Sequence, residues 1–305
     1  MNSGKDAADV GLIVLTAVGV LALAAALWGI LIERNWYAIR RENLRILPKG
    51  TKSITVLHIS DVHMAPWQKR KQRWIKRLGN EAIDLVVNTG DNLGHSDGIA
   101  PVLESYSGLL SRPGVFVHGS NDYYAPALRN PLAYLRAPSQ RGETAALDTP
   151  ALTRGFEIAG WRNLNNAGAS LVVNGTRIGF IGVDDPHDGL DDLDSLPKSA
   201  AELGQVDLVF GVAHAPYLKV IDAMADAGAQ LMFAGHTHGG QVGIPGFGAI
   251  ITNCDLPRQH AKGLSAWAGG RLALNVCAGL GHSIYAPVRF AVRPEVRILT
   301  LLPVE

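Results

Sequence analysis

Cysteine and net charge are what this sequence has least of. Its 305 residues include only Cys254 and Cys277, too few for a disulfide framework. Two packed thiols are the simpler interpretation, and a single disulfide between them stays open. With 28 Lys and Arg against 27 Asp and Glu, the net charge of +1 creates no field that would attract a polyanion, so no nucleic acid polymer is expected as a partner.

Charge is also absent from one long stretch near the N-terminus. From Val10 to Ile32 every residue is uncharged and most are apolar, and a helix of about 20 such residues crosses a hydrocarbon core. Trp28 and Trp36 lie at one end of this stretch, where interfacial aromatic residues are expected. We therefore expect residues 1–33 to form a single N-terminal membrane anchor.

A cleaved signal peptide and a buried core helix are the alternatives for this stretch. Lys5 is accompanied by Asp6 and Asp9, which makes a poor positive n-region, and the apolar run is long for a core helix. Basic residues follow the run at Arg34, Arg40, Arg41 and Arg45. Because cytoplasmic flanks carry the excess of Lys and Arg, the positive-inside tendency places the main domain on the cytoplasmic side.

Residues 34–52 are expected to be a linker that ends at a Pro-Lys-Gly turn, and residues 53–305 to be the folded domain. This domain alternates β-branched runs with helical patterns, which indicates an α/β fold. The expected strands are 53–59, 84–88, 115–118, 171–173, 177–182, 206–210, 230–234, 272–276 and 296–302. The expected helices lie near 67–80, 100–111, 127–136, 197–203 and 216–228. Residues 136–168, rich in Pro, Gly and polar residues, are expected to be an irregular arm.

One of the expected helices is strongly basic. Between Trp67 and Arg77 there is no acidic residue, and the basic residues are Lys69, Arg70, Lys71, Arg73, Lys76 and Arg77. A solvated helix face is the plain interpretation. The alternative is a surface that lies on anionic lipid headgroups, where each basic residue contributes about 1 kcal/mol.

The residues with the most chemical information follow expected strands. Five strand ends carry D-x-H at 61–63, G-D at 90–91, G-S-N-D at 119–122, H-A-P at 214–216 and G-H-T-H-G-G-Q at 235–241. In open α/β sheets ligands gather beyond the carboxyl ends of strands, so these side chains should converge. A lone His beside a strand is more often structural, but five such motifs in order predict a metal centre. Its imidazole and carboxylate donors suit Mn, Fe or Zn better than Ca or Mg.

This set of motifs resembles the calcineurin-like metallophosphoesterase family over nearly all of residues 53–302. The long G-H-T-H-G-G-Q form and the ending P-V-R-F…P-E-V-R-I-L-T-L, residues 287–301, are similar to the membrane-associated bacterial branch. That branch includes enzymes that hydrolyse the pyrophosphate of UDP-diacylglucosamine. The fold that the resemblance implies is two mixed β-sheets packed as a sandwich and flanked by helices, here preceded by one transmembrane helix.

The resemblance also implies a centre of two divalent or trivalent metal ions. The implied ligands are Asp61, His63 and His238 for the first ion, His214, His236 and an amide for the second, and Asp91 as the bridge. A hydroxide that bridges the two ions would attack the phosphorus in line, while the ions neutralise the charge that develops on the phosphoryl oxygens. No side-chain nucleophile is needed, and the sequence contains no G-x-S-x-G elbow and no phosphate-binding P-loop.

One motif departs from the family pattern. The family has Gly-Asn-His-Asp, in which the Asn binds metal and the His contacts the phosphoryl group or protonates the leaving oxygen. This chain has G-S-N-D at 119–122, so strict alignment puts Ser120 at the amide position. A one-residue slip puts Asn121 there, and we favour it because an amide oxygen is a better ligand than a neutral hydroxyl. In both cases the usual His is missing.

The missing His affects the leaving group. The phosphate of a pyrophosphate hardly needs protonation, whereas an alkyl alcohol loses the 10²–10⁴-fold that a general acid typically supplies. His282, in a glycine-rich turn, is the first candidate to replace it; His95, His118 and His187 are weaker, and a structural role is the simpler interpretation for all four. Tyr123 is expected to form an apolar wall for a lipid or nucleoside part of the substrate, although packing under a loop is the default interpretation.

The sequence therefore predicts two-metal hydrolysis of a phosphodiester or pyrophosphate bond in a membrane-associated or lipid-linked substrate. A tethered phosphodiesterase for a soluble or cyclic nucleotide is one alternative, and a phosphoprotein phosphatase is another, although no nucleotide fingerprint or docking element supports them. The alternative from another class is a catalytically weak metal-binding scaffold in which the G-S-N-D loop marks lost activity. Six intact ligand positions argue against that scaffold.

Overall fold

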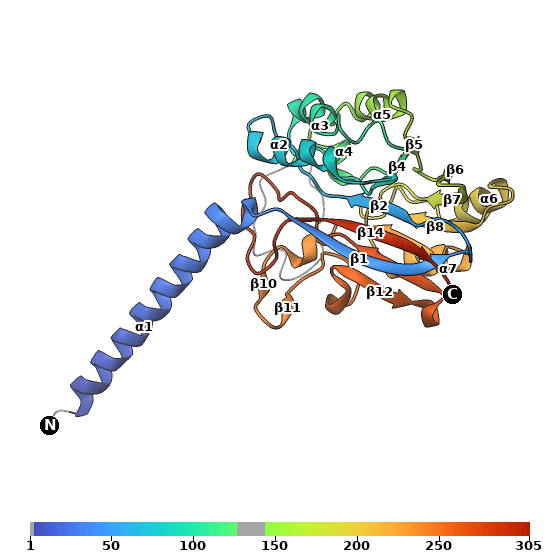
Figure 1. Cartoon of the computed structure of the whole chain (residues 1–305). Coiled ribbons are helices and arrows are strands. Elements are labelled where there is room, and N and C mark those ends of the chain that lie inside the picture. Colours follow the sequence, from blue (N-terminus) through green and yellow to red (C-terminus); the bar gives the residue numbers. More distant parts are fainter. Residues whose placement is uncertain (1–2, 127–143) are drawn as a thin grey trace.

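The computed structural model describes residues 3–126 and 144–305 of the chain. One long N-terminal helix projects from a layered α/β domain (Figure 1). This helix, α1 (Ser3–Leu27), continues into a π-helical turn η1 (Trp28–Ile32) and a 3-10 turn η2 (Glu33–Asn35). Over Asp9–Asn35 it is long and apolar enough to cross a membrane, and the domain does not cover its apolar side chains.

Two six-stranded mixed sheets form the domain. The first has the order β1-β14-β2-β3-β4-β5, and its strands are β1 (Ala38–Leu47), β2 (Ile54–Ile59), β3 (Leu85–Asn88), β4 (Gly114–Phe116), β5 (Arg162–Asn163) and β14 (Glu295–Pro303). The second has the order β12-β13-β9-β8-β7-β6, and its strands are β6 (Ala167–Val173), β7 (Thr176–Gly182), β8 (Leu208–Val212), β9 (Leu231–Ala234), β12 (Gly263–Trp267) and β13 (Leu272–Val276). A separate hairpin joins β10 (Gly243–Ile244) to β11 (Gly248–Ala249). Strands β2 to β5 run parallel in one sheet, as do β7, β8, β9 and β13 in the other.

The apolar side chains of the strands divide between a central core and two outer cores. In β2, Ile54 and Val56 lie in the cluster between the sheets, whereas Leu57 and Ile59 lie in the outer cluster, as the alternation of side chains along a strand requires. The first sheet's outer face is covered by α2 (Lys69–Arg77), α3 (Ile99–Ser105) and α5 (Thr149–Ile158). The second is covered by α6 (Ser195–Glu202) and α7 (Leu218–Asp226). The predicted sandwich flanked by helices is therefore confirmed.

Most elements that the sequence predicts are present. All nine expected strands and four of the expected helices, α2, α3, α6 and α7, are found near their predicted positions. The expected helix at 127–136 lies outside the described residues. The expectation of an irregular arm over 136–168 was wrong in its second half, which contains α5 and β5, because Leu152 and Phe156 of α5 are buried against the first sheet.

The expectation that residues 34–52 form a linker is contradicted by β1. This strand pairs in parallel with β14 along its length, and Leu47 at its end is fully buried in the cluster between the sheets. In the sequence, charged residues interrupt the alternation of apolar and polar residues that would have indicated a strand here. An edge strand tolerates them, and Glu42 forms a 2.7 Å ion pair with Arg297 of β14.

Replacing Leu47 with Ala tests whether β1 is part of the folded domain. Because Leu47 is fully buried, we expect Leu47→Ala to lower the free energy of unfolding by about 2–5 kcal/mol. Chemical unfolding of the purified protein in detergent measures this, with Leu190→Ala, at a position that is 40% exposed, as the matched control. If residues 34–52 were a linker, both substitutions would change the free energy of unfolding by less than about 0.5 kcal/mol.

Candidate metal centre

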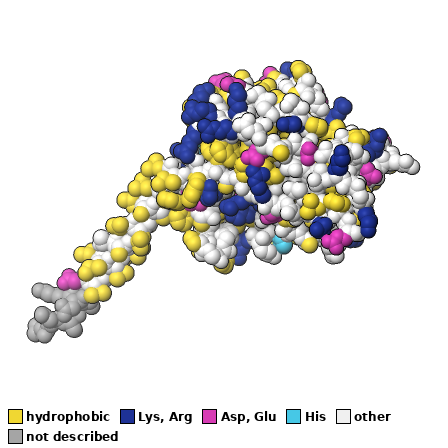
Figure 2. Space-filling view, viewed as in Figure 1, with side chains coloured by type: hydrophobic (Ala, Val, Ile, Leu, Met, Phe, Trp, Pro, Cys, Tyr) yellow, Lys and Arg dark blue, Asp and Glu magenta, His cyan; other side chains and the backbone are white. Residues whose placement is uncertain are grey.

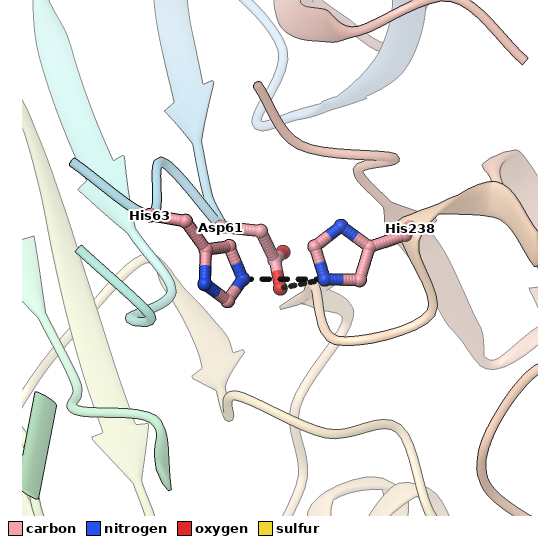
Figure 3. A group of neighbouring side chains, drawn as sticks. All are labelled: Asp61, His63 and His238. Atoms are coloured by element: carbon pink, nitrogen blue, oxygen red, sulfur yellow. Dashed lines mark hydrogen bonds and ion pairs between the residues drawn. The ribbon is translucent and has the colours of Figure 1, made fainter. Parts of the chain in front are cut away.

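The loops that follow β2, β3, β8 and β9 meet at one edge of the two sheets. They deliver Asp61, His63, Asp91, His214, His236 and His238, the six residues that the sequence motifs single out. In one group, the donor atoms of Asp61, His63 and His238 all lie within 4.8 Å of one another. In Figure 3 the rings of His63 and His238 point toward the Asp61 carboxylate between them, and their Nε2 atoms are 3.2 Å apart.

A second group of donors shares Asp61 with the first. Asp61, Asp91 and His214 also bring their donor atoms within 4.8 Å of one another, and all three residues are buried. The two groups are candidates for two neighbouring metal sites, and their mixture of carboxylates and imidazoles suits transition metals. Sequence motifs from separate loops therefore converge as expected.

Asp91 occupies the position expected of a bridging ligand. Its Oδ2 lies 3.4 Å from Nε2 of His63 and 3.6 Å from Nε2 of His214, which belong to opposite sheets. The backbone N–H of Asn121 donates to Oδ1 of Asp91 at 2.8 Å, and the Asn121 amide donates to Oδ2 at 2.7 Å. Asn121 is thus in contact with the carboxylate at the centre of the site, within the short helix α4 (Ser120–Tyr123).

The Nε2 atom of His214 is a candidate metal ligand. Its Nδ1–H donates to the carbonyl of Thr89 at 2.7 Å, so Nε2 carries the lone pair once the ring is neutral. That Nε2 atom is buried and, among the described residues, has no hydrogen-bond partner. Because buried polar atoms almost always have a partner, an orphaned nitrogen that faces Asp91 fits a metal ligand.

A buried polar chain extends from Thr89 to the edge of the sheets. The Thr89 hydroxyl accepts from Nε2 of His58 at 3.0 Å, and Nδ1 of His58 accepts from the Asn275 amide at 2.9 Å. Arg297 in turn donates to the oxygen of Asn275 at 2.7 Å. Burial lowers the pKa of His58 to about 3, so its neutral ring holds a fixed tautomer behind the site.

His236 lies beside the two groups of donors rather than within them. Its backbone N–H donates to both carboxylate oxygens of Asp61, at 3.0 and 3.1 Å. Its ring centre is 5.2 Å from that of His214, and its Nε2 is 3.2 Å from the carbonyl of Asn253. His236 therefore orients Asp61 through its backbone and places an imidazole next to His214.

Burial gives most of the ligand imidazoles the protonation state that metal binding needs. It lowers the pKa of His63 to about 4 and those of His236 and His238 well below the usual value, so their rings are neutral near pH 7. For His214 burial also acts downward, but the surrounding carboxylates, chiefly Asp91, raise its pKa to about 9. Metal binding at His214 therefore releases a proton.

The backbone at the ligands is held in a strained conformation. Five ligands lie in the left-handed region: Asp61 (φ 48°), His63 (φ 43°), Asp91 (φ 54°), His236 (φ 67°) and His238 (φ 49°). This conformation costs a residue with a side chain about 1–3 kcal/mol and is found mostly at functional sites. Packing of the surrounding loops must offset this cost. That packing is close enough to require glycine at two positions. A Cβ at Gly119 would collide with Asp91 and His214, and one at Gly279 would collide with Asp61.

Two buried basic side chains support the candidate ligand loops and were not singled out as part of the site from the sequence. Arg289, fully buried, donates to the carbonyl of His238 at 3.1 Å and to that of Gly281 at 3.0 Å. Lys71 donates to the carbonyl of Val62 at 2.7 Å, between two ligands. Arg289 could be noticed only through the P-V-R-F segment, and Lys71 is indistinguishable in sequence from its exposed basic neighbours.

The histidines considered as replacements for the missing family His take different positions. The Nδ1–H of His282 donates to the carbonyl of Ser283 at 2.9 Å, and burial lowers the pKa of His282 to about 3, so the ring is a neutral part of its own loop and a poor acid. His118 contacts Thr153, and His95 packs on Trp67. Of these four histidines, His187 packs against a candidate ligand: its ring centre lies 4.5 Å from that of His236.

Tyr123 is held by hydrogen bonds within its own loops. Its hydroxyl donates to the carboxylate of Asp184, at 2.7 and 2.8 Å, and accepts from the amide of Asn165 at 2.8 Å. These bonds join the loop after β4 to the loop after β7. Tyr123 therefore holds these two loops together. Its expected role as an apolar wall for the substrate remains a prediction.

Replacing Asp91 with Ala tests whether these donors hold metal. We expect the wild-type protein to bind two ions per chain and Asp91→Ala to bind less than about one, because the variant lacks the carboxylate that faces both His63 and His214. Elemental analysis of the purified proteins measures this, with circular dichroism to check folding. Asp226→Ala, at an exposed position of α7, is the control. Unchanged metal content in Asp91→Ala would contradict the site.

Known relatives resemble the chain over most of its length. It is 24% identical over 298 residues to the uncharacterized metallophosphoesterase YkuE of Bacillus subtilis (strain 168), covering 94% of this chain and 91% of that protein. It is 28% identical over 257 residues to the uncharacterized protein YpbG of the same organism, covering 83% of each. Among solved structures, TT1561 of Thermus thermophilus aligns with 75% of this chain and 91% of its own, with 13% identity and a TM-score of 0.46.

The sequence profile of the calcineurin-like phosphoesterases matches residues 54–240, more than half of the chain. This range begins with β2 and ends in the turn that follows β9. It therefore contains every residue of the two donor groups, together with Asn121 and His236. The chain belongs to the calcineurin-like phosphoesterase family, and it is a metallophosphoesterase.

Proposed function

We propose that this metallophosphoesterase hydrolyses a phosphodiester or pyrophosphate bond in a membrane-associated or lipid-linked substrate. The convergence of two donor groups on Asp61 and Asp91 carries the hydrolytic part of the proposal. The apolar helix α1, joined to the domain that bears these residues, carries the membrane part. Each donor follows the end of a strand, and the donors occur along the chain in the order D-x-H, G-D, H and G-H-T-H. This order supports two metal ions as resident cofactors.

The chain's own residues would position the cofactors and the substrate. Two ions bound here supply Lewis-acid activation of water and neutralise charge on the phosphoryl oxygens. The ligand set that we propose is Asp61, His63 and His238 for one ion, His214, His236 and Asn121 for the other, and Asp91 between them, with Mn, Fe or Zn as the metal. Since Asn121 is hydrogen-bonded to Asp91, its amide is close enough to the centre to serve. Buried Arg289 and Lys71 would keep the loops in register when substrate binds.

The position of the membrane follows from α1. We propose that α1 is a single-pass anchor and that the domain lies on the cytoplasmic side, as the excess of basic residues after the helix favours. Arg40 and Arg41 lie near the start of β1, a few residues after the helix, whereas Arg45 lies toward its far end, where it pairs with Glu305 at 3.7 Å. A substrate fixed in the same membrane would reach the metal centre by lateral diffusion.

The leaving group of the substrate distinguishes this enzyme from relatives with the usual His. We expect a bis-aryl phosphodiester to be hydrolysed faster than a matched alkyl diester by about 10²–10⁴-fold, because the alkoxide needs a proton that the G-S-N-D loop does not supply. Turnover of the two diesters by the metal-loaded protein measures the ratio. His282→Ala is the control and should leave both rates unchanged. Equal rates for aryl and alkyl diesters would refute the missing-acid argument.

The two candidates for the amide position are separated by paired substitutions. If Asn121 binds the second ion, Asn121→Ala should weaken binding of one ion by about 10–100-fold, whereas Ser120→Ala should leave metal affinity nearly unchanged. Titration of the metal-free variants with Mn²⁺ or Zn²⁺ by calorimetry gives both affinities. The reverse pattern, with loss only in Ser120→Ala, would support the strict alignment and remove Asn121 from the ligand set.

A further inference from the structure

The membrane helix joins the domain through packed contacts rather than through a free tether. In η1, Gly29 is buried and its carbonyl accepts a hydrogen bond from the N–H of Arg289 at 3.3 Å. A Cβ at Gly29 would collide with the Arg289 carbonyl, so the contact depends on glycine. Just beyond η2, the guanidinium of Arg293 lies 4.0 Å from the centre of the Trp36 ring. The point at which α1 leaves the domain is therefore fixed, and a bilayer around α1 meets one side of the domain.

The basic helix α2 lies on that side. The ring of Tyr37, which follows η2, packs 5.3 Å from the ring of Trp74 in α2. Residues of α2 that are both basic and exposed are Lys69, Arg70, Arg73, Lys76 and Arg77, and the helix has no acidic residue. Figure 2 shows a group of Lys and Arg side chains near the point where the apolar helix meets the domain, in the place where Figure 1 draws α2. Positive charge in this position complements anionic lipid headgroups.

The hairpin β10–β11 carries apolar side chains on the other side of the same junction. Figure 1 shows α2 above and the hairpin below the point where α1 enters the domain. Ile244, Phe247 and Ile250 of the hairpin are exposed, with Phe247 at 62%. The N–H of Gly243 donates to the carbonyl of Phe290 at 2.8 Å, so the hairpin is attached beside the Arg289 contact with α1. Exposed apolar residues at a tip are stabilised when they leave water for the membrane interface.

We propose that the exposed basic residues of α2 and the apolar tip of the β10–β11 hairpin form one membrane-docking surface, which lies on an anionic lipid bilayer around α1. The proposal rests on the membrane insertion of α1 proposed above. Lipid is the partner that fits, because the surface continues a membrane-spanning segment and combines charge of one sign with an apolar tip.

The two elements of this docking surface, α2 and the hairpin, are connected to the loops of the metal centre. Lys71 of α2 donates to the carbonyl of Val62, which lies between the ligands Asp61 and His63. Arg289, in contact with the end of α1, donates to the carbonyl of His238. The hairpin follows His238 after one short turn. Docking would therefore set the metal centre beside the lipid headgroups, where the phosphoryl group of a lipid-linked substrate lies.

An environment-sensitive fluorophore on one accessible introduced cysteine tests the docking surface in the full-length protein, because native Cys277 is fully buried. In a Cys254→Ser background, the label is placed at Phe247→Cys in the hairpin, at Val172→Cys on β6 as the exposed control, and at Leu21→Cys in α1 as the control for insertion. The proteins are reconstituted in vesicles of phosphatidylcholine and phosphatidylglycerol that contain nitroxide-labelled lipid. We expect quenching at positions 21 and 247 and none at position 172.

Two outcomes of this experiment overturn the proposal in different ways. If the label at position 21 is quenched while that at 247 behaves like that at 172, α1 is inserted but the hairpin does not dock. If none of the three labels is quenched, α1 is not in the membrane, and the membrane part of the proposed function fails together with the docking surface. Hydrolysis of a soluble phosphodiester is measured separately and is not affected by either outcome.

The role of charge is tested by removing it from α2. Arg70→Gln, Arg73→Gln, Lys76→Gln and Arg77→Gln together should lower the docked-to-undocked ratio at position 247 by at least about tenfold in anionic vesicles and leave it unchanged in pure phosphatidylcholine. The matched control removes four exposed basic residues from other elements, by Arg154→Gln, Arg162→Gln, Arg177→Gln and Lys198→Gln. Equal quenching in the two quadruple variants would refute a charge-dependent docking surface.

Discussion

The carboxylate of Asp91 lies where loops from the two sheets meet. It faces a histidine from each sheet, His63 and His214, and accepts two hydrogen bonds from Asn121. In the absence of an ion such a crowded, buried set of donors is unfavourable, because carboxylates and imidazoles lose their hydration without gaining full partners. A pair of cations would offset this cost, which fits the metal dependence of the calcineurin-like phosphoesterase family.

The rest of the architecture serves to hold these donors in place. Parallel strands bring their carboxyl ends to one edge, the left-handed ligand residues turn the chain there, and glycine backbone allows the loops to approach. Arg289 contacts both the metal centre and the end of the N-terminal helix. Its side chain donates to the carbonyl of His238, and its backbone N–H donates to the carbonyl of Gly29 in η1, which continues α1. The apolar helix and the loops of the metal centre are therefore neighbours in the structure, although α1 and His238 are far apart in sequence.

The sequence predicted the site better than the details that surround it. Polar residues at strand ends located the side chains that converge in the two donor groups, since motif and strand end are both local features of the chain. Strand β1 was missed because Arg40, Arg41 and Glu42 hide its apolar alternation, and only its pairing with β14 makes it a strand. The sequence could not show that the His282 ring is hydrogen-bonded to its own loop, at the carbonyl of Ser283. Nor could any sequence spacing show that tertiary packing brings His187 next to His236. The role of Lys71 depended on burial, which its basic neighbours do not share.

Anomalous diffraction from crystals of the metal-loaded protein would locate bound ions independently of activity. We expect two anomalous peaks separated by about 3.5–4 Å. One should lie among Asp61, His63 and His238, the other beside His214 and His236, with Asp91 in contact with both. A single peak, or two peaks away from Asp91, would contradict a two-metal centre built on these residues.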